Sequence, residues 1–314
     1  MGAVDMRVTI GSVSLPNPVM TAAGTAGHGA EFAKLMALDE LGAVVVKSIA
    51  AFPWLGNPMP RVAATDAGMI NAVGLQGPGL QAWLEHDLAK LLGETQRVVV
   101  SIWGRTVSEY EQAAAMLADA PAGVIAVEVN LSCPNLEGRS SMFAHSESAT
   151  ADAIAATAAC GRPRWAKLSP NTHRLVEIAA AAHAAGAEAV TLVNTVLGMV
   201  IDPETLRPVL ANGGGGLSGA AIRPVAVRAI YDVRAAHPEL PIIGVGGVSL
   251  AEHAVELMAA GASAVQIGTA SFLHPRAARQ VLRSLESWCS DRGVGHVSSL
   301  TSSAHRPDES KESS

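Results

Sequence analysis

The sequence of 314 residues has few aromatic side chains, few cysteines and no long apolar run. Aromatic residues account for 4% of the chain and hydrophobic residues for 49%, so the core has to be built mainly from Ala, Val, Leu and Ile. That composition is typical of a buried parallel sheet wrapped by helices. No apolar run approaches the roughly 20 residues of a membrane span, and polar residues interrupt the N-terminal segment 1–9, which argues against a signal peptide. We therefore expect a soluble protein.

Charge and cysteine content exclude further classes of protein. The formal net charge is -6 and Lys and Arg form no cluster, which argues against a nucleic-acid-binding surface and a polybasic membrane patch. Cys133, Cys160 and Cys289 are far apart and odd in number, so they predict neither a disulfide framework nor a metal or cluster site. The sequence thus favours a protein of the reducing cytoplasm that binds a small molecule and no metal.

A short β-branched run followed by an Ala- and Leu-rich segment with helical spacing recurs along the chain. The predicted strands are residues 18–20, 44–47, 98–102, 126–130, 165–168, 189–193, 242–245 and 264–267. The predicted helices are residues 30–38, 79–92, 108–118, 149–160, 172–185, 222–236, 250–260 and 275–288. Such alternation requires parallel strands with crossover helices, in an open doubly wound sheet or a closed barrel. Eight regular units favour an α/β fold with a single (β/α)₈ TIM barrel.

We expect residues 1–297 to form one catalytic barrel domain and residues 298–314 to form a disordered tail. The tail is rich in Ser, alternates in charge and has almost no apolar residues with which to pack. Two connections, residues 50–78 and 194–221, are longer than the usual loops of this fold. Both leave the carboxyl ends of predicted strands, where barrel enzymes keep their active sites, so we expect them to contribute to function.

Polar and reactive side chains collect where predicted strands end. They are Lys47, Ser48, Asn130, Cys133, Lys167, Ser169, Asn194 and Thr195. Each alone has an ordinary structural explanation, because a Lys at a strand end is usually solvated and an Asn often closes a turn. Cys160 and Cys289 lie in predicted helices and are expected to be buried. Cys133 instead lies in a Ser-Cys-Pro-Asn turn at the functional face, where a thiol with a pKa of about 8.5 needs modest electrostatic help to act as a base.

Two glycine signals follow the seventh and eighth predicted strands, Gly244-Val245-Gly246-Gly247 and Gly268-Thr269. Tight turns would explain them, but loops at these two positions of a barrel commonly bind phosphate. A dinucleotide fingerprint is excluded because its last glycine would fall on Ser249. A phosphate site together with strand-end lysines fits flavin mononucleotide (FMN), with Lys167 facing the negative charge of the reduced ring. Pyridoxal phosphate remains open, since a Schiff base also needs a buried lysine.

Taken together, the motifs resemble the dihydroorotate dehydrogenases, and within them the class I, B-type catalytic subunit, over about residues 6–288. The motifs that carry the resemblance are Lys47-Ser48, Gly56-Asn57-Pro58-x-Pro60-Arg61, the segment Gly68 to Gln76, Asn130-Leu131-Ser132-Cys133-Pro134-Asn135, Lys167-Leu168-Ser169-Pro170-Asn171, Val193-Asn194-Thr195 and Gly215-Gly216-Leu217-Ser218-Gly219.

The resemblance implies FMN-dependent oxidation of (S)-dihydroorotate to orotate in the de novo synthesis of UMP. Hydride would pass from substrate C6 to flavin N5, and Cys133 would take the C5 proton. The residues implied in substrate binding are Lys47, Asn71, Ala72, Val73, Gly74, Leu75, Asn130, Asn194 and Thr195. Those implied in FMN binding are Ala23, Lys47, Ser48, Ser101, Asn130, Lys167, Val193, Gly219, Gly246, Gly247, Gly268 and Thr269. The implied partners are a second copy of the chain and an electron-transfer subunit with FAD and a [2Fe-2S] cluster, which passes electrons to NAD⁺ in a heterotetramer.

The chain departs from the family pattern at several places. Ser101 stands where Asn is usual, bulky Trp103 stands where a small residue is usual, and Phe52-Pro53-Trp54 replaces a common Pro-Arg pair. The loop after Asn135 also lacks the usual Gly-Gly pair. Two other functions therefore stay open: a flavin enzyme of the dihydropyrimidine dehydrogenase type, and a non-catalytic barrel that binds a phosphorylated ligand.

Overall fold

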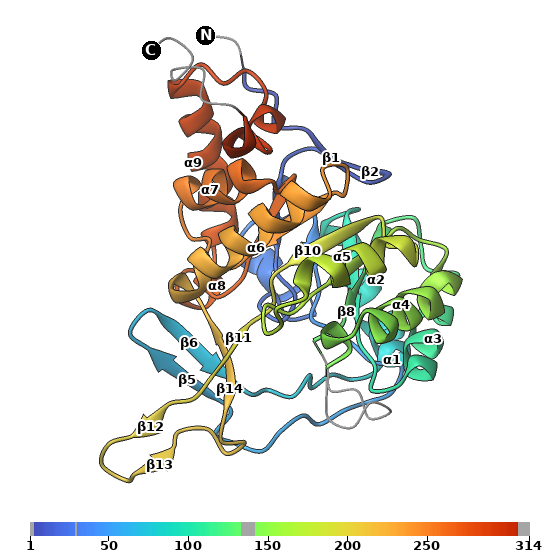
Figure 1. The fold of residues 1–314 in the computed structure, drawn as a ribbon. Helices are drawn as coiled ribbons and strands as arrows, with labels where there is room; N and C mark the ends of the chain where they lie inside the picture. The colour runs from blue at the N-terminus through green and yellow to red at the C-terminus, as the bar shows by residue number, and fades with distance from the viewer. Residues whose placement is uncertain (1–2, 29, 133–141, 307–314) are drawn as a thin grey trace.

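The computed structural model describes residues 3–28, 30–132 and 142–306 (Figure 1). At its centre is a sheet of eight parallel strands in the order β3-β16-β15-β10-β9-β8-β7-β4. The strands are β3 (Val19–Thr21), β4 (Val44–Val45), β7 (Val98–Ile102), β8 (Val124–Asn130), β9 (Arg164–Lys167), β10 (Ala189–Leu192), β15 (Ile242–Val245) and β16 (Ala264–Ile267). From β4 to β16 each strand pairs with the next of these strands along the chain, and β16 pairs with β3. All eight predicted strands and the (β/α)₈ barrel class are thus confirmed.

The barrel closes where its first and second strands, β3 and β4, meet. A parallel bridge joins Met20 to Ala43, and the Gly42 amide donates to the Val19 carbonyl at 2.8 Å. The buried Thr21 hydroxyl completes the seam, because it accepts from the Val45 amide at 2.9 Å and lies 3.1 Å from the Val45 carbonyl, to which it donates. A side chain therefore supplies hydrogen bonds where the two short strands have no regular ladder.

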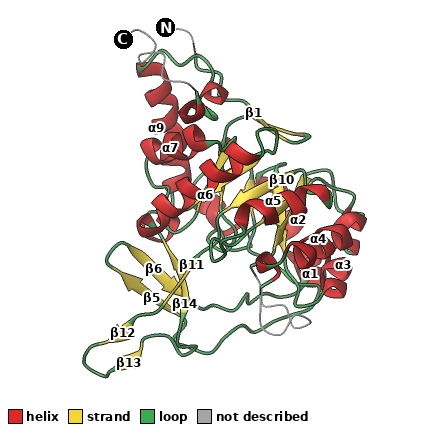
Figure 2. Ribbon diagram, in the orientation of Figure 1, coloured by secondary structure: helices red, strands yellow, loops and turns green. Residues whose placement is uncertain are grey.

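Helices surround the barrel, as Figure 2 shows. They are α1 (Leu80–His86), α2 (Leu88–Glu94), α3 (Val107–Ala115), α4 (Glu147–Ala156), α5 (Leu175–Ala184), α6 (Arg223–Ala236), α7 (Ala251–Ala260), α8 (Ala270–Leu273) and α9 (Ala277–Asp291). Side-chain caps begin two of them: the Thr106 hydroxyl accepts from the Glu109 amide, and the Ser146 hydroxyl accepts from the Ala149 amide. Among the described residues, no helix combines the length and apolar character needed to cross a membrane.

The prediction of a helix over residues 30–38 was wrong. That segment forms the 3₁₀ turn Ala30–Lys34, and a second 3₁₀ turn follows at Leu38–Glu40. Its most buried side chains are Met36 and Leu38, two positions apart, a spacing that does not lie on one face of an α-helix. The other seven predicted helices are confirmed, the one over residues 79–92 as the pair α1 and α2.

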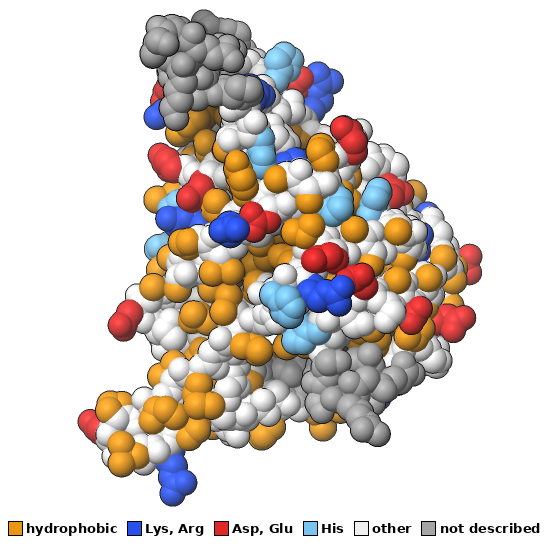
Figure 3. All heavy atoms as spheres, in the orientation of Figure 1, with side chains coloured by type: hydrophobic (Ala, Val, Ile, Leu, Met, Phe, Trp, Pro, Cys, Tyr) orange, Lys and Arg blue, Asp and Glu red, His pale blue; other side chains and the backbone are white. Residues whose placement is uncertain are grey.

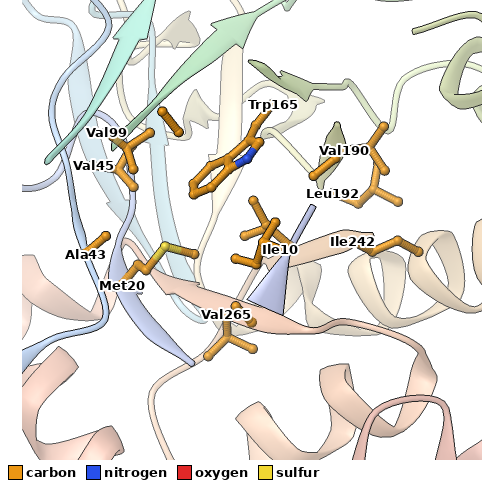
Figure 4. Close-up of a cluster of buried hydrophobic side chains, with 14 of the residues drawn as sticks. Ile10, Met20, Ala43, Val45, Val99, Trp165, Val190, Leu192, Ile242 and Val265 are labelled. Atoms are coloured by element: carbon orange, nitrogen blue, oxygen red, sulfur yellow. The ribbon is translucent and has the colours of Figure 1, made fainter. Parts of the chain in front are cut away.

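A hairpin of β1 (Val8–Ile10) and β2 (Val13–Leu15) lies at the amino ends of the barrel strands. The Ser12 amide and hydroxyl both donate to the Glu188 carboxylate, which directly precedes β10, at 2.8 and 2.7 Å. Figure 4 shows Ile10 of this hairpin among barrel side chains that include Met20 and Trp165, all fully buried. The packed hairpin leaves the carboxyl ends of the strands as the open face of the barrel.

The two long connections form a second sheet, which we call the arm. It comprises β5 (Val62–Thr65), β6 (Gly68–Asn71), β11 (Val196–Gly198) and β14 (Gly215–Ser218), in the order β11-β14-β6-β5. A short hairpin of β12 (Ile201–Asp202) and β13 (Arg207–Pro208) extends from it (Figure 2). The central pairing joins β6 to β14, which lie far apart in the sequence. We had expected connections here but not a sheet.

The prediction of a disordered tail was wrong for residues 298–306. Val297–Leu300 and Ser303–His305 form 3₁₀ turns, and Val297 is fully buried. The His305 ring stacks on Tyr231 with centroids 4.0 Å apart, and its Nε2 lies 2.9 Å from the Ala260 carbonyl. A few apolar and aromatic contacts therefore order a segment whose composition is mostly polar. Residues 307–314 lie outside the described part of the chain.

Candidate active site

A chain of hydrogen bonds between polar side chains crosses the carboxyl end of the barrel. The hydroxyls of Ser48 and Ser101 lie 2.9 Å apart, and the Asn130 amide donates to Ser48 at 3.2 Å. The Asn194 amide in turn donates to the Asn130 side-chain oxygen at 3.3 Å. Ser48, Ser101 and Asn130 are at most 5% exposed. Residues from the ends of β4, β7, β8 and β10, each predicted to belong to the site, are thus joined in one network.

Below this network, a buried ion pair lies inside the barrel. The Lys167 ammonium is 3.5 Å from the Glu128 carboxylate, and the two residues are 5% and 0% exposed. The second carboxylate oxygen of Glu128 accepts from the Thr191 hydroxyl at 3.2 Å and from the Gln266 amide at 2.7 Å. Lys167 therefore has a fixed position, and the carboxylate of opposite charge is held by side chains from β9, β10 and β16.

Glu128 and Gln266 were missed as site residues in the sequence, where both fall inside apolar strand segments. A signal was present for Glu128, which is a charged residue within the run Val-Ile-Ala-Val-Glu-Val-Asn. A carboxylate in a strand buried on both faces requires a partner, and a strand-end lysine was the obvious candidate.

The segment Asn71 to Leu75, expected to bind substrate, is held from outside by residues 54–61. The Asn57 amide donates to the Val73 carbonyl at 3.0 Å, and the Asn57 side-chain amide donates to the Ala72 carbonyl at 2.9 Å. Gly74 and Leu75 both have positive φ, 75° and 61°. A non-glycine residue in that region is uncommon, so the loop is held in a particular shape by its contacts.

Asn71 and Thr195 meet at one glycine of the arm. The Asn71 side-chain amide donates to the Gly216 carbonyl at 3.3 Å. A Cβ on Gly216 would lie 2.0 Å from the Thr195 hydroxyl oxygen, so only glycine allows this approach. The Asn171 side chain holds the same stretch by donating to the Thr195 carbonyl at 3.0 Å. The arm thereby brings residues of both long connections to the open face of the barrel.

Lys47 follows β4 at the same face, and its backbone amide donates to the Gly27 carbonyl at 2.9 Å. Burial lowers the pKa of the Lys47 ammonium below its ordinary value, and the positive charge of Arg61 lowers that pKa further. Arg61 donates to the Gln76 side chain and lies 3.3 Å from the Asn57 carbonyl, to which it also donates. Two positive groups therefore lie close enough to interact at this face, an arrangement that suits an anionic ligand.

The glycines expected to bind phosphate come together at the ends of β15, β16 and β14. A Cβ on Gly247 would lie 2.8 Å from the Gly219 carbonyl oxygen, and a Cβ on Gly219 would lie 2.6 Å from Gly68. Gly246 and Gly247 have φ of 143° and 70°. A side chain at any of the three positions would overlap neighbouring atoms, so the backbone is closely packed here, and we call Gly219, Gly246 and Gly247 the glycine cradle.

Three further predicted contacts lie around that cradle. The Thr269 hydroxyl donates to Ser218 at 2.8 Å, while Gly268 lies beside Ala22, the neighbour of Ala23 in sequence. Directly after β10, the Val193 amide donates to the Val245 carbonyl at 2.8 Å.

The expected base, Cys133, lies outside the described residues, as do Pro134 and Asn135. The described chain reaches Ser132, whose amide donates to the Asn130 side chain at 3.2 Å, so the segment leaves the barrel beside the polar network. The Tyr110 hydroxyl fixes this exit by donating to the Asn130 carbonyl at 2.6 Å. Cys160 and Cys289 are buried as predicted, and burial raises the pKa of both thiols.

A groove of about 740 Å³ lies at the opposite, amino end of the barrel, lined by residues of the hairpin and of the 298–301 segment. Its charged lining side chains, Asp5 and Arg7, are paired with each other at 2.6 Å. None of the strand-end residues described above lines it. The candidate site therefore lies at the carboxyl ends of the strands.

Comparison with known proteins identifies the family of the chain. The sequence model of the family described as dihydroorotate dehydrogenase matches residues 5–288. A protein of Desulforudis audaxviator is 46% identical over 304 residues, which cover 96% of this chain and 98% of the relative. A protein of Geobacter sp. (strain M21) is 45% identical over 297 residues, which cover 94% and 97%. Both are named dihydroorotate dehydrogenase B (NAD(+)), catalytic subunit. With a barrel of the expected topology and the motif residues gathered at its open face, the chain belongs to the dihydroorotate dehydrogenase family.

Proposed function

We propose that this protein oxidises (S)-dihydroorotate to orotate with FMN as its cofactor. The observation that carries the proposal is the convergence of Asn71, Asn130, Asn194 and Thr195 at one end of the barrel, beside the positive charges of Lys47 and Arg61. A planar anionic ring with several amide donors and acceptors matches amide side chains, because each can both donate and accept. Membership of the family supports the same substrate.

The residues present fit FMN. The cradle of Gly219, Gly246 and Gly247 offers backbone at close range, as a phosphate site requires, and Thr269 places a hydroxyl at its edge. At the other end of the site, Lys167 and the Ser48–Asn130 network present a positive charge and hydrogen-bonding groups. Ala23, Ser101, Val193 and Gly268 complete the proposed flavin contacts.

FMN, when bound, supplies the acceptor for the hydride that leaves substrate C6. The chain's own residues have the other tasks. Lys47 attracts the substrate carboxylate, while Asn71, Asn130 and Asn194 fix the plane of the ring, so that the C6 hydrogen has one orientation. Lys167 stabilises negative charge at the pyrimidine end of the flavin site. Cys133, which directly follows Ser132, takes the proton from C5, which balances the loss of hydride from C6.

The electron acceptor and partners belong to the same proposal. The relatives are named as NAD(+)-dependent catalytic subunits, which supports a second subunit that passes electrons on to NAD⁺. We propose that this subunit carries FAD and a [2Fe-2S] cluster. The arm offers a surface for assembly into a homodimer, because it carries several exposed apolar side chains (Figure 3). These are Val62, Leu197 and the adjacent Met199 on the arm, and Ile201 and Leu206 on the hairpin that extends from it, between 48% and 76% exposed.

The deciding experiment begins with a spectrum of the purified protein. Flavin absorption, and release of FMN on denaturation, are expected. Dihydroorotate added without oxygen should bleach the bound flavin, whereas dihydrouracil should not. Bleaching by dihydrouracil alone would favour an enzyme of the dihydropyrimidine dehydrogenase type, and a colourless protein without redox activity would favour a non-catalytic barrel. NAD⁺, fumarate and a quinone, tested as acceptors with and without a copurifying subunit, identify the route of the electrons.

A further inference from the structure

Three aromatic rings and one guanidinium form a cluster next to the candidate substrate loop. Phe52, Trp54 and Trp103 contact one another edge to face, with centroids 5.8–6.2 Å apart. The Arg105 guanidinium lies over Phe52 at 4.6 Å and over Trp54 at 4.9 Å. We call these four residues the aromatic cluster. Its members come from the connections after β4 and β7, and its three aromatic residues stand at positions where the sequence departs from the family pattern.

The cluster holds the loop through Trp54. The Trp54 amide donates to the Gly77 carbonyl and the Gly77 amide donates to the Trp54 carbonyl, both at 2.9 Å. The Trp54 indole N–H donates to the Gly74 carbonyl, also at 2.9 Å. Backbone and side chain of one residue therefore hold the two ends of the turn Gly74 to Gly77.

Packing holds the middle of the same turn. Leu75 has φ of 61° and packs against Ala50 and Trp103, which is 2% exposed. A leucine in the left-handed region costs about 1–2 kcal/mol relative to its ordinary conformations. The apolar contact with Trp103 offsets part of that cost, so the loop shape depends on the bulky ring at a position where the family usually has a small residue.

The charge of the cluster is balanced. Arg105 donates to the Glu109 carboxylate at 2.7 Å, and Glu109 is the fourth residue along the chain from it. The pair adds no net charge next to the site, so the influence of the cluster on a ligand acts through the position of the loop and not through long-range attraction.

We propose that Trp54, supported by Phe52, Trp103 and Arg105, is a positioning residue that fixes the Gly74–Leu75 turn in the shape that binds the substrate. This inference rests on the proposed function, in which the segment Asn71 to Leu75 contacts dihydroorotate. It adds a determinant of substrate affinity that lies outside the residues in contact with substrate.

The test compares one chemical change at two members of the cluster. Trp54→Phe keeps a ring and removes an indole N–H that is bonded to the loop. Trp103→Phe also keeps a ring, but it removes an indole N–H that has no hydrogen-bond partner among the described residues. Trp54→Phe is expected to raise KM for dihydroorotate about three- to fivefold, which corresponds to about 0.7–1 kcal/mol, with kcat and FMN content unchanged. Trp103→Phe is expected to change KM less than twofold.

Two outcomes would overturn the proposal. If Trp54→Phe leaves KM unchanged, its indole bond does not position the loop. If both variants raise KM equally, or lower kcat and FMN content together with it, the rings have only a general packing role.

Hydrogen exchange provides a readout that needs no substrate. In the wild-type protein the Gly77 amide, bonded to Trp54, should exchange as slowly as amides of β6, and Trp54→Phe should speed exchange across residues 72–77 while Trp103→Phe does not. Fast exchange of this segment in the wild type would refute the positioning role, even if a variant failed to fold. The expected exchange pattern together with inactivity toward dihydroorotate would instead refute the proposed function and leave the positioning role intact.

Discussion

Replacing Glu128 by glutamine isolates the contribution of the buried ion pair inside the barrel. At 3.5 Å and an effective dielectric constant of ~20, the attraction between Glu128 and Lys167 is about 5 kcal/mol before desolvation is counted. Removing one partner of a buried pair costs about 3–5 kcal/mol, because the other charge stays buried without compensation. Glutamine keeps an oxygen that can accept from Thr191 and Gln266, so we expect the lower end of this range, about 3 kcal/mol.

The measurement is urea unfolding of the variant, followed by circular dichroism. With a denaturant slope of ~3 kcal/mol/M, the midpoint should fall by about 1 M. Glu256→Gln is the matched control: its partner Arg223 is nearer, at 2.8 Å, but the two side chains are 46% and 26% exposed. Such a pair contributes about 0–1 kcal/mol.

A double variant completes the test of the ion pair. Glu128→Gln combined with Lys167→Met removes both charges and should unfold at higher urea concentration than Glu128→Gln alone. Equal midpoints for Glu128→Gln and Glu256→Gln would refute the reasoning, since burial would then have no influence on the value of the pair.

Three further predictions concern the site. Cys133→Ser should retain FMN but slow flavin reduction by dihydroorotate at neutral pH by at least tenfold, because an alcohol is a far weaker acid than a thiol. A rate of flavin reduction equal to that of the wild type, measured by stopped flow, would exclude the thiol as base. Because the pKa of Lys47 is lowered, this side chain loses its charge at a lower pH than an ordinary lysine, and kcat/KM should fall on the alkaline side. Lys47→Arg should move that fall to higher pH, since arginine keeps its charge. Identical pH profiles of the two proteins would contradict the assignment of Lys47 to the substrate carboxylate. Gly247→Ala should weaken FMN binding at least tenfold in a titration of the flavin-free protein, whereas Gly161→Ala, which has a similar φ of 60° but open space around it, should not.

The barrel could be predicted from the sequence because its signal is local and repeated. A run such as Val98–Ile102, followed by a helix that begins at a capping residue such as Thr106, is readable without knowledge of the neighbouring strands. Prediction failed where a segment is ordered by distant contacts. The 3₁₀ turn Ser303–His305 depends on a stack with Tyr231, and nothing in its own composition indicates that contact.

The arm shows that strands which depend on distant partners are also hard to predict from the sequence. Strand β14 reads Gly-Gly-Leu-Ser, which has neither β-branched residues nor alternation, and its partner β6 precedes it by more than 140 residues. Strands of this kind form because the partner backbone supplies hydrogen bonds, and single-sequence periodicity does not detect them.

The site residues were identified as motifs, but the sequence did not show how they support one another. Asn71 and Thr195 were both expected to bind substrate, and the structure adds that Gly216 joins them, with the Asn71 amide on its carbonyl and the Thr195 hydroxyl where its Cβ would be. Because β14 carries Gly216 and also pairs with β6, a displacement of the arm would move both residues together. The arm also carries exposed apolar side chains, so any partner that binds there would contact a structure continuous with the substrate site. We therefore expect that a homodimer formed through the arm, as proposed above, would change substrate affinity through a four-residue strand whose glycines leave no space for a side chain.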